Sequence, residues 1–232
     1  ITRDLRMIKS VAELGKITQA VEIAGRAFAR VGEVAAPGRA LSDVFRRFQM
    51  LCLDEGADWV PYLAGAAGPD GYADVISPAT DAPLAEGDVL MLDTGLVWDG
   101  YFCDYDRNFG IGSVGPEIRS AHAMLIEATE AAREIATPSV TMAELYRAMD
   151  RILNLGPEAG RLGHGLGMQL TEWPSILPFD HTPAAPGMVL TLEPYVATRD
   201  GHILVHEENI VIEEGGARYL STPAAREIRL LG

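Results

Sequence analysis

Residues 88–109 read DVLMLDTGLVWDGYFCDYDRNF, and this stretch predicts two strands joined by a tight turn. The pair Asp99-Gly100 is a strong hairpin signal, because glycine adopts the positive φ that such turns require. With the turn there, Asp93 lies diagonally across from Asp104, and the alternation of side chains puts both carboxylates on one face. Two acids on an apolar face repel one another unless a cation lies between them or one of them faces solvent. This stretch by itself leaves both alternatives open.

A weak internal duplication brings further acids to equivalent positions. Residues 82–95 (APLAEGDVLMLDTG) and 182–195 (TPAAPGMVLTLEPY) are related by an offset of one hundred, and Asp93 falls on Glu193. Six residues of the first copy are identical to those one hundred positions later: Pro83, Ala85, Gly87, Val89, Leu90 and Leu92. A further strand is predicted after each copy, and these two strands carry the acids Asp104, Glu207 and Glu208. The fold therefore offers carboxylates from two related hairpins.

Length and composition indicate a globular domain with a substantial core. The chain has 232 residues, 48% hydrophobic and 22% charged, and no apolar run of about 18 residues that would suggest a membrane span. The net charge of −14 argues against nucleic acid and anionic membrane as partners. Two cysteines, Cys52 and Cys103, do not form a disulfide framework and fit a reducing compartment, so a cytoplasmic location is predicted.

The helical pattern predicts an α+β layer structure in which helices cover one face of a sheet. Apolar stripes predict helices over residues 11–31, 41–53, 116–135 and 141–153, and Ser10 with Glu13 forms a capping-box pattern. A strand is predicted over 59–64 and a loop over 66–80. Each half then reads helix, helix, hairpin, within a single domain over 1–232. Since the chain starts Ile1-Thr2-Arg3 without methionine, we expect it to be a piece of a longer or processed protein.

A histidine in a glycine-rich segment completes a candidate metal centre. His164 lies in GHGLG, where glycines let the backbone approach a bound group closely, although a surface turn is the alternative. His122 is interpreted as structural, and three others are expected to be exposed or supporting rather than ligands: His181, His202 and His206. One imidazole with four carboxylates favours a pair of divalent ions, with Mn²⁺ the natural choice and Co²⁺, Fe²⁺ or Zn²⁺ feasible. A structural zinc site would be rich in cysteine.

Five motifs in order resemble the pita-bread metallohydrolases, the family of methionine aminopeptidase, aminopeptidase P, prolidase and creatinase. They contain Asp93, Asp104 (GYFCDYDRNF), His164 (GHGLG), Glu193 (TLEPYV) and Glu207 (HEENIVI). The spacing of eleven between the two aspartates is similar to the proline-specific branch. The resemblance implies a pita-bread fold with two pseudo-symmetric αα-ββ halves, a curved and mostly antiparallel sheet, and a preceding N-terminal domain. It also implies that one metal takes Asp93, Asp104 and Glu207, that the other takes Asp104, His164, Glu193 and Glu207, and that Glu207 rather than Glu208 is the ligand.

Three departures from that family concern the surroundings of the metals. Peptidases of this branch carry substrate-binding histidines at the positions of Ile76 and Thr171, and a threonine at that of Asp106. Other donors are therefore expected to compensate, and the candidates are Tyr72, His181, His202 and Arg107. The metal core is thus expected to be kept and the substrate-binding residues changed.

The resemblance implies a dinuclear metal-dependent hydrolase of the Xaa-Pro aminopeptidase or dipeptidase type, in which metal-activated water attacks an amide. Glu193 is then the expected general base, with His164 beside it. The substrate, a small peptide or small amide, would be bound near Thr171, Ile76, Tyr72 and Arg107. One alternative is an enzyme of the same fold acting on a small non-peptide metabolite, as in creatinase, ectoine hydrolase or dimethylsulfoniopropionate lyase. A non-catalytic binding module is the other. A homodimer is also expected.

Overall fold

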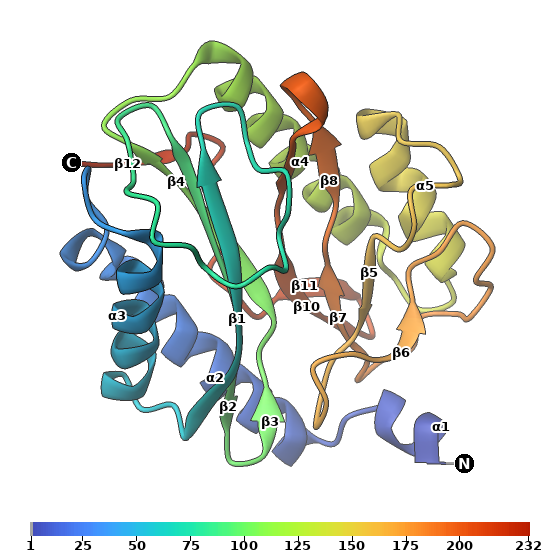
Figure 1. The fold of residues 1–232 in the computed structure, drawn as a ribbon. Helices are drawn as coiled ribbons and strands as arrows, with labels where there is room; N and C mark the ends of the chain where they lie inside the picture. Colours follow the sequence, from blue (N-terminus) through green and yellow to red (C-terminus); the bar gives the residue numbers. More distant parts are fainter. Residues whose placement is uncertain (1) are drawn as a thin grey trace.

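The computed structural model describes residues 2–232 and contains two similar halves, each with a pair of long helices followed by strands (Figure 1). The first half comprises α1 Thr2–Met7, α2 Val11–Ala29, α3 Leu41–Asp54, β1 Trp59–Gly68, β2 Val89–Trp98, β3 Tyr101–Phe102 and β4 Tyr105–Ile111. The second half comprises α4 Pro116–Ile135, α5 Met142–Leu153, β5 Gly163–Gly165, β6 Glu172–Ser175, β7 Val189–Leu192, β8 Tyr195–Ala197, β9 Ile203–Val205, β10 Glu208–Glu213 and β11 Gly216–Tyr219. The remaining elements are β12 Arg229–Leu231 and the 3-10 turns Val31–Glu33 and Arg199–Gly201.

The four long helices agree with the sequence prediction to within two residues at each end. Ser10 and Glu13 form the predicted capping box at the start of α2, and Thr141 forms a second one with Glu144 at the start of α5. Their buried faces follow the predicted apolar stripes, since the helical repeat places residues three and four apart on one side. The exception is Val11, which begins the predicted stripe of α2 but is 88% exposed.

Two five-stranded sheets form the centre of the molecule (Figure 1). In the first, β2 lies between β1 and β4 in antiparallel pairing, β3 continues the pairing with β2, and β12 joins β4 in parallel. The second has the order β11-β10-β7-β5-β6 and is antiparallel throughout. A separate ribbon is formed by β8 and β9. The predicted antiparallel α+β class is therefore confirmed.

One continuous register runs through the first hairpin. Trp98 lies opposite Tyr101 at the turn, and further along Asp93 lies opposite Asp106, so that Asp104 is diagonal to Asp93 as predicted. The turn residue Asp99 has a φ of 45° and the next residue, a glycine, a φ of 80°, as such a turn requires. Turn chemistry thus fixes which acids share a face.

The predicted strands are shorter than expected where the acids occur. The strand predicted over 102–109 is broken before β4 at Asp104, the one over 189–195 is broken at Glu193, and the one over 203–212 is broken at Glu207. At these breaks the side chains of Asp104, Glu193 and Glu207 need not alternate between the two faces of a sheet, as they would within a regular strand. By contrast, β1 is longer than predicted. It extends four residues further, to Gly68, because it pairs with β2 along its whole length. The predicted loop therefore begins later than residue 66.

The internal duplication is repeated in the backbone hydrogen bonds. The N–H of Gly87 donates to Ile111 and that of Gly187 donates to Ile212, each at 2.9 Å. Both glycines have positive φ, 97° and 89°. Isolated bridges pair Ala40 with Pro83 and Thr141 with Pro183, so each copy meets the start of its own helix in the same way. The halves are therefore related in structure as well as in sequence.

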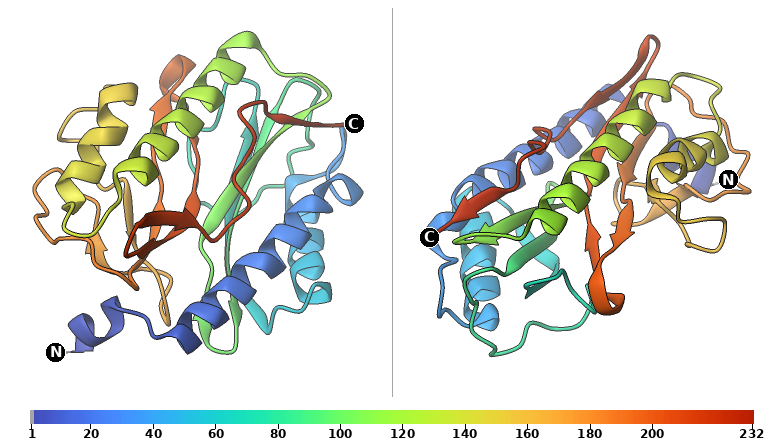
Figure 2. Two further views of the ribbon diagram at one scale, coloured as in Figure 1. Left: turned by 180° about the vertical axis from the view of Figure 1, so that it is seen from behind. Right: turned by 90° about the horizontal axis from the view of Figure 1, so that it is seen from above.

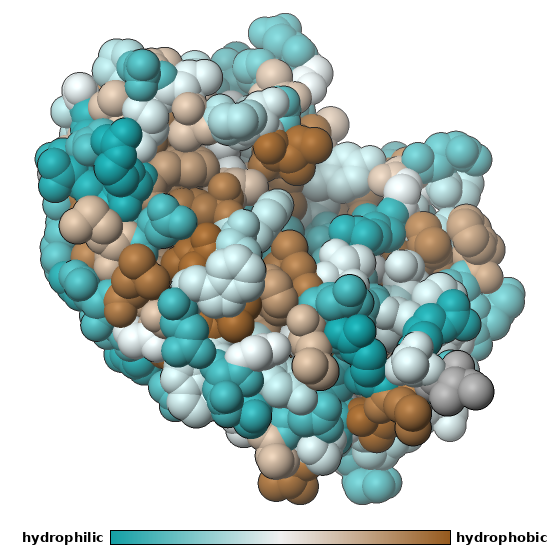
Figure 3. Space-filling view, turned by 60° about the horizontal axis from the view of Figure 1, so that its bottom comes forward, coloured by the Kyte–Doolittle hydropathy of each residue, from teal (hydrophilic) through white to brown (hydrophobic). Residues whose placement is uncertain are grey.

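Long helices cover one side of the sheets, as Figure 2 shows for α2 and α4. The helix α2 packs on β2, and α4 packs on α5 and β11. Among the described residues, no helix has both the length and the apolar character needed to cross a bilayer. The surface in Figure 3 is mixed: apolar side chains gather left of the centre of the view, and polar side chains surround them and lie along both edges.

Candidate metal centre

Three carboxylates from both halves meet where the two sheets adjoin. Asp93 comes from the middle of β2, Asp104 from the break before β4, and Glu207 from the break between β9 and β10. Each offers an oxygen within 4.8 Å of the oxygens of the other two, and all three side chains are buried. Such a cluster is costly without a cation, because burial removes water and the charges repel.

The state of these acids reflects both burial and crowding. Burial, followed by the charges of neighbouring acids, raises the pKa of Asp93 and of Glu207 well above their usual values. Burial also raises the pKa of Asp104, to about 6, although His164 opposes the rise. One oxygen each of Asp93 and Glu207, Oδ1 and Oε2, is buried without a hydrogen-bond partner. Unpartnered buried carboxylate oxygens are what a bound cation would satisfy, so the residues present fit divalent ions.

His164 and Glu193 flank the cluster. The Nε2 of His164 lies 3.2 Å from Asp104 Oδ2 and 3.4 Å from Glu193 Oε2, and its Nδ1 lies 2.8 Å from the carbonyl oxygen of Gly165. That carbonyl orients the ring so that Nε2 faces the acids. Burial lowers the pKa of His164, but the two carboxylates outweigh it and raise the pKa to about 10. Burial raises the pKa of Glu193, but His164 and Arg161 outweigh it and lower the pKa below its usual value.

A second charged network lies directly behind Glu207. The backbone N–H of Glu207 donates to Asp106 at 2.8 Å, and Nδ1 of His206 lies 3.3 Å from the same carboxylate oxygen. His206 Nε2 lies 3.4 Å from Glu208, which also accepts from Arg107 at 3.0 Å. Burial raises the pKa of Glu208, but Arg107 and His206 outweigh it and hold the pKa at about 2. His206 is therefore buried and supporting, one of the two outcomes expected for it, and Glu208 is held in an ion pair with Arg107.

Three residues near the acids were not singled out in the sequence. Tyr62, on β1 opposite Gly95, interacts with Asp93 and thereby opposes the rise in the pKa of that acid. Arg161 donates from Nε to Glu193 Oε1 at 2.8 Å. Asn209 accepts from the backbone N–H of Asp104 at 3.1 Å and donates to its carbonyl. Asn209 lies within the HEENIVI motif, but nothing in the sequence marks its amide, and Tyr62 and Arg161 carry no spacing signal. The pairing of distant segments brings these residues to the site.

The residues predicted to bind substrate lie in different surroundings. The side chain of Ile76 is 77% exposed, and Thr171 is exposed just before β6. Tyr72 is buried and donates its hydroxyl to Asn108. Arg107 lies next to Asp106 in β4, and alternation directs its side chain to the opposite face of the sheet, where it contacts Glu208 and backbone carbonyls. The substrate roles of all four stay predictions.

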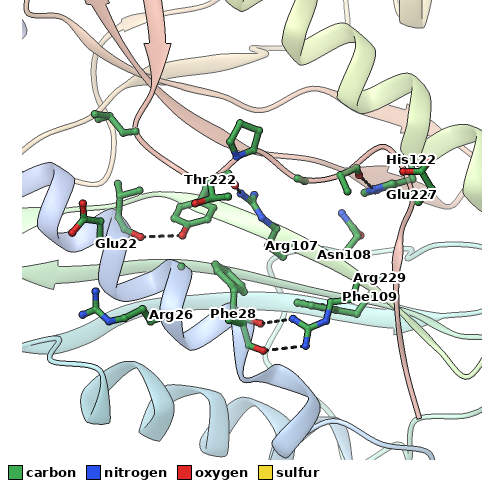
Figure 4. A pocket seen from close by; sticks show the side chains of 18 residues that line it. Glu22, Arg26, Phe28, Arg107, Asn108, Phe109, His122, Thr222, Glu227 and Arg229 are labelled. Atoms are coloured by element: carbon green, nitrogen blue, oxygen red, sulfur yellow. Dashed lines mark hydrogen bonds between the residues drawn. The ribbon is translucent and has the colours of Figure 1, made fainter.

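That opposite face carries a cavity of about 580 Å³ between α2, α4 and the segment 220–229. Figure 4 shows Arg107 and Arg229 extending into this space. Arg107 stacks on the ring of Tyr105, and Arg229 donates to the carbonyls of Phe28 and Ala29. The cavity is separate from the acid cluster, which lies on the other side of β4.

Comparison with known proteins shows what this chain resembles. The sequence profile of metallopeptidase family M24 matches residues 15–218. The chain belongs to metallopeptidase family M24. It is 30% identical to the Xaa-Pro dipeptidase of Pyrococcus furiosus, over 98% of this chain and 66% of that protein, and 32% identical to the probable dipeptidase PepE of Mycobacterium bovis, over 94% and 59%. This M24 chain thus spans about two thirds or less of the length of these relatives.

Solved structures of M24 relatives have the same fold. An X-Pro aminopeptidase from Thermotoga maritima superimposes with a TM-score of 0.91 at 28% identity, over 99% of this chain and 66% of that chain. The prolidase from Pyrococcus furiosus gives 0.89 at 29%, over 97% and 68%. The pita-bread fold expected from the resemblance is therefore confirmed, and M24 membership implies divalent metal ions.

Proposed function

We propose that this chain is the catalytic part of a dinuclear metal-dependent peptidase that cleaves short peptides before proline. The observation that carries the proposal is the convergence of Asp93, Asp104 and Glu207 within 4.8 Å, with buried carboxylate oxygens that have no other partner. The names of the relatives, Xaa-Pro dipeptidase and prolidase, supply the reaction class.

The proposed ligand sets follow the positions of the side chains. Asp93, Asp104 and Glu207 would hold one ion, and Asp104 and Glu207 would share the second with His164 and Glu193. Four carboxylates and one imidazole form an oxygen-rich donor set that suits Mn²⁺, although Co²⁺, Fe²⁺ or Zn²⁺ could bind the same groups. The ring orientation of His164, fixed by the carbonyl of Gly165, presents Nε2 to this centre.

The ions, when bound, would activate a water molecule and polarise the substrate carbonyl. Glu193 is ionised at neutral pH, because its pKa is lowered, and its side chain keeps 15% exposure at the edge of the cluster. It is therefore the proposed proton acceptor. Asp106 accepts from the backbone N–H of Glu207 and so holds that residue in place. The homodimer, the cytoplasmic location and the single catalytic domain over 1–232 stay predictions from the sequence.

The alternatives from the sequence receive less support. A non-catalytic module is disfavoured because all five proposed ligands are present: Asp93, Asp104, His164, Glu193 and Glu207. Ile76 and Thr171 favour a non-peptide substrate, but the relatives are named as peptidases. The peptide reaction is therefore the better supported of the two.

The test is a metal-reconstitution assay with a panel of substrates. Metal-stripped protein is loaded with Mn²⁺, Co²⁺ or Zn²⁺ and given Leu-Pro, Leu-Ala and creatine. We expect metal-dependent release of proline from Leu-Pro, and a loss of at least about 100-fold in kcat for Glu193→Gln. Glu214→Gln, at an exposed glutamate, is the matched control. Metal-dependent turnover of creatine with no cleavage of either dipeptide would replace the proposal with the metabolite alternative.

A further inference from the structure

A buried ion pair ties the start of the chain to the loop between β5 and β6. The short helix α1 packs against β6 at the lower right of Figure 1. Just after α1, Nζ of Lys9 donates to Oε2 of Glu172 at 3.1 Å, and Arg6 donates to Oε1 of the same carboxylate at 2.6 Å. The side chains of Lys9 and Glu172 are 2% and 4% exposed, although 163 residues separate them in the sequence. Charged side chains are buried this completely almost only when they are paired.

The ion pair is not needed to hold the N-terminal segment, because backbone contacts already hold it. The N–H of Lys9 donates to the carbonyl of Gly187 at 2.9 Å, and Ile8 pairs with Met188 in an isolated bridge. Burial lowers the pKa of Lys9, although Glu172 opposes the fall. A buried ion pair commonly adds little net stability, since the loss of water offsets the attraction. What the pair adds is therefore the placement of the Glu172 carboxylate.

The carboxylate of Glu172 shapes the loop of residues 166–171. Its Oε1 accepts from the backbone N–H of Gln169 at 3.1 Å, and a Cβ at Gly167 would lie 2.7 Å from its Oε2. The loop is thus folded round this carboxylate. From there the loop reaches the first half of the molecule, where the N–H of Phe102 donates to the carbonyl of Gly167 at 2.9 Å.

One side chain of this loop, Leu170, lies beside the acid cluster. It fills the space over Gly95, where a Cβ would be 2.2 Å from Leu170 Cδ1. Gly95 follows Asp93 by two residues in β2, so alternation places both on one face, roughly 7 Å apart. Tyr62, which interacts with Asp93, lies opposite Gly95 on β1. Leu170 and Tyr62 are both half-buried and so form a partly exposed apolar wall next to the acids.

We propose that Lys9 is a positioning residue for substrate binding. Through Glu172 it holds the loop 166–171 in the place where Leu170 completes the wall, and this inference rests on the proposed function. A substrate whose scissile carbonyl lies at the proposed ions carries side chains within several Å of that carbonyl, which is the separation of the acids from the wall. The proposed ligand closest to the loop in the sequence, His164, is held instead by the pairing of β5 with β7. Loss of Lys9 should therefore weaken substrate binding and leave metal binding intact.

The first test is kinetic and uses Mn²⁺-loaded protein with Leu-Pro as the substrate. Lys9→Met keeps the apolar stem and removes the charge. It should raise KM about 10-fold or more and change kcat by less than about 2-fold, because substrate binding is weakened while the reacting groups stay in place. The Kd for Mn²⁺ should not change. Lys9→Arg should restore most of the KM, since a guanidinium also pairs with a carboxylate. Arg133→Met is the matched control, because Arg133 also joins distant segments, from α4 to the carbonyl of Ala217 in β11 at 3.2 Å, and belongs to neither the loop nor the proposed centre.

Amide hydrogen exchange gives a readout that needs no substrate. In Lys9→Met, protection should fall at least about 10-fold at two amides. These are the N–H of Gln169, which donates to Glu172, and the N–H of Phe102, which donates to the loop. Protection in the pairing of β5 with β7 around His164 should match that of the parent. An equal loss of protection throughout the sheets would show that Lys9 only stabilises the fold, and would overturn the inference.

A second variant keeps the test decisive if Lys9→Met fails to fold, since that variant leaves a buried carboxylate with one partner fewer. Lys9→Met/Glu172→Gln removes both charges and should show the same loosened loop and the same rise in KM. A loosened loop with an unchanged KM, or a loop whose protection is unchanged, would overturn the role of Lys9 and leave the proposed function standing. If the unaltered protein cleaves no dipeptide, the proposed function fails, and the exchange data alone then support or overturn the anchoring of the loop by Lys9.

Discussion

At the scale of single residues, Asp93 is held in a place that suits a cation better than it suits a bare carboxylate. Its pKa is raised, first by burial and then by the charges of Asp104 and Asp106. A folded-state pKa above the unfolded value of about 3.9 means that the folded protein binds this proton more tightly. The resulting stabilisation is complete below about pH 4 and is lost as pH rises through the raised value.

Asp93→Asn should therefore have opposite effects with and without metal. At pH 8 the metal-free variant should melt about 2–4 °C above the metal-free parent, which corresponds to about 1 kcal/mol for a chain of this size. With saturating Mn²⁺ the variant should melt below the parent, since it lacks a ligand. Thermal scans of both states, with Glu214→Gln as control, measure this. A melting temperature that falls equally in both states would contradict the interpretation of Asp93 as a ligand.

Proton release gives a second test at this scale. Burial lowers the pKa of His164, but Asp104 and Glu193 outweigh it and raise the value to about 10, so the metal-free ring is protonated at pH 7.5. A metal ligand must be neutral imidazole, so Mn²⁺ binding should release at least ~1 proton. Calorimetry in buffers of different ionisation enthalpy counts these protons.

The matched variants are His164→Gln and His122→Gln. The first should release about one proton fewer, because it removes the imidazolium. The second should release as many as the parent, since burial lowers the pKa of His122 to about 4 and the ring is already neutral. Binding enthalpies that do not depend on the buffer would rule out His164 as a ligand.

At the scale of elements, the duplicated turns at Gly87 and Gly187 offer a matched pair. Both have positive φ, but a Cβ at Gly87 would meet nothing within 4 Å, whereas one at Gly187 would meet Ile8 Cγ2 and Lys9 O, each at 3.0 Å. Gly87→Ala should lower the free energy of unfolding by about 1–2 kcal/mol through backbone strain alone. Gly187→Ala should cost about 1–3 kcal/mol more. Urea denaturation measures both, and equal costs would show that the segment at Ile8 moves aside freely.

The helices and strands could be predicted from the sequence where a local pattern of residues determines them. Helix α4 was predicted at its observed bounds, because an apolar stripe and a proline at the first turn are local signals. The short strands β5 and β12 were missed, since Gly163–Gly165 and Arg229–Leu231 carry no alternation and become strands only by pairing with distant partners. The contact of Arg161 with Glu193 was missed for the same reason: a lone arginine gives no spacing signal.

At the scale of the whole molecule, Asn209 joins the two halves. Its side chain, fully buried, binds both backbone groups of Asp104 in the first half and the hydroxyl of Thr191 in the second. The proposed centre draws Asp93 and Asp104 from one half and the remaining ligands from the other. Its geometry therefore depends on how the sheets are held together.

Asn209→Leu should lower the free energy of unfolding by about 2–4 kcal/mol, because it leaves the buried N–H and carbonyl of Asp104 without this partner. Thr191→Val removes a single hydroxyl from the same network and should cost about 1 kcal/mol. Urea denaturation gives both values, and Mn²⁺ titration should show weaker binding for Asn209→Leu. If both variants lowered the free energy of unfolding by the same small amount, the halves would be held together chiefly by apolar packing.

The turn at Asp99 and Gly100 has a consequence for how this gene can change. Because one register runs from the turn to Asp93 and Asp106, inserting a single residue there would reverse the face of every later side chain in the hairpin. The number of residues between Asp93 and Asp104 is therefore under the same selection as the two acids themselves. Insertions and deletions in homologous genes should be absent from this hairpin and should accumulate in the loop between β1 and β2, where added codons leave the spacing of the acids intact.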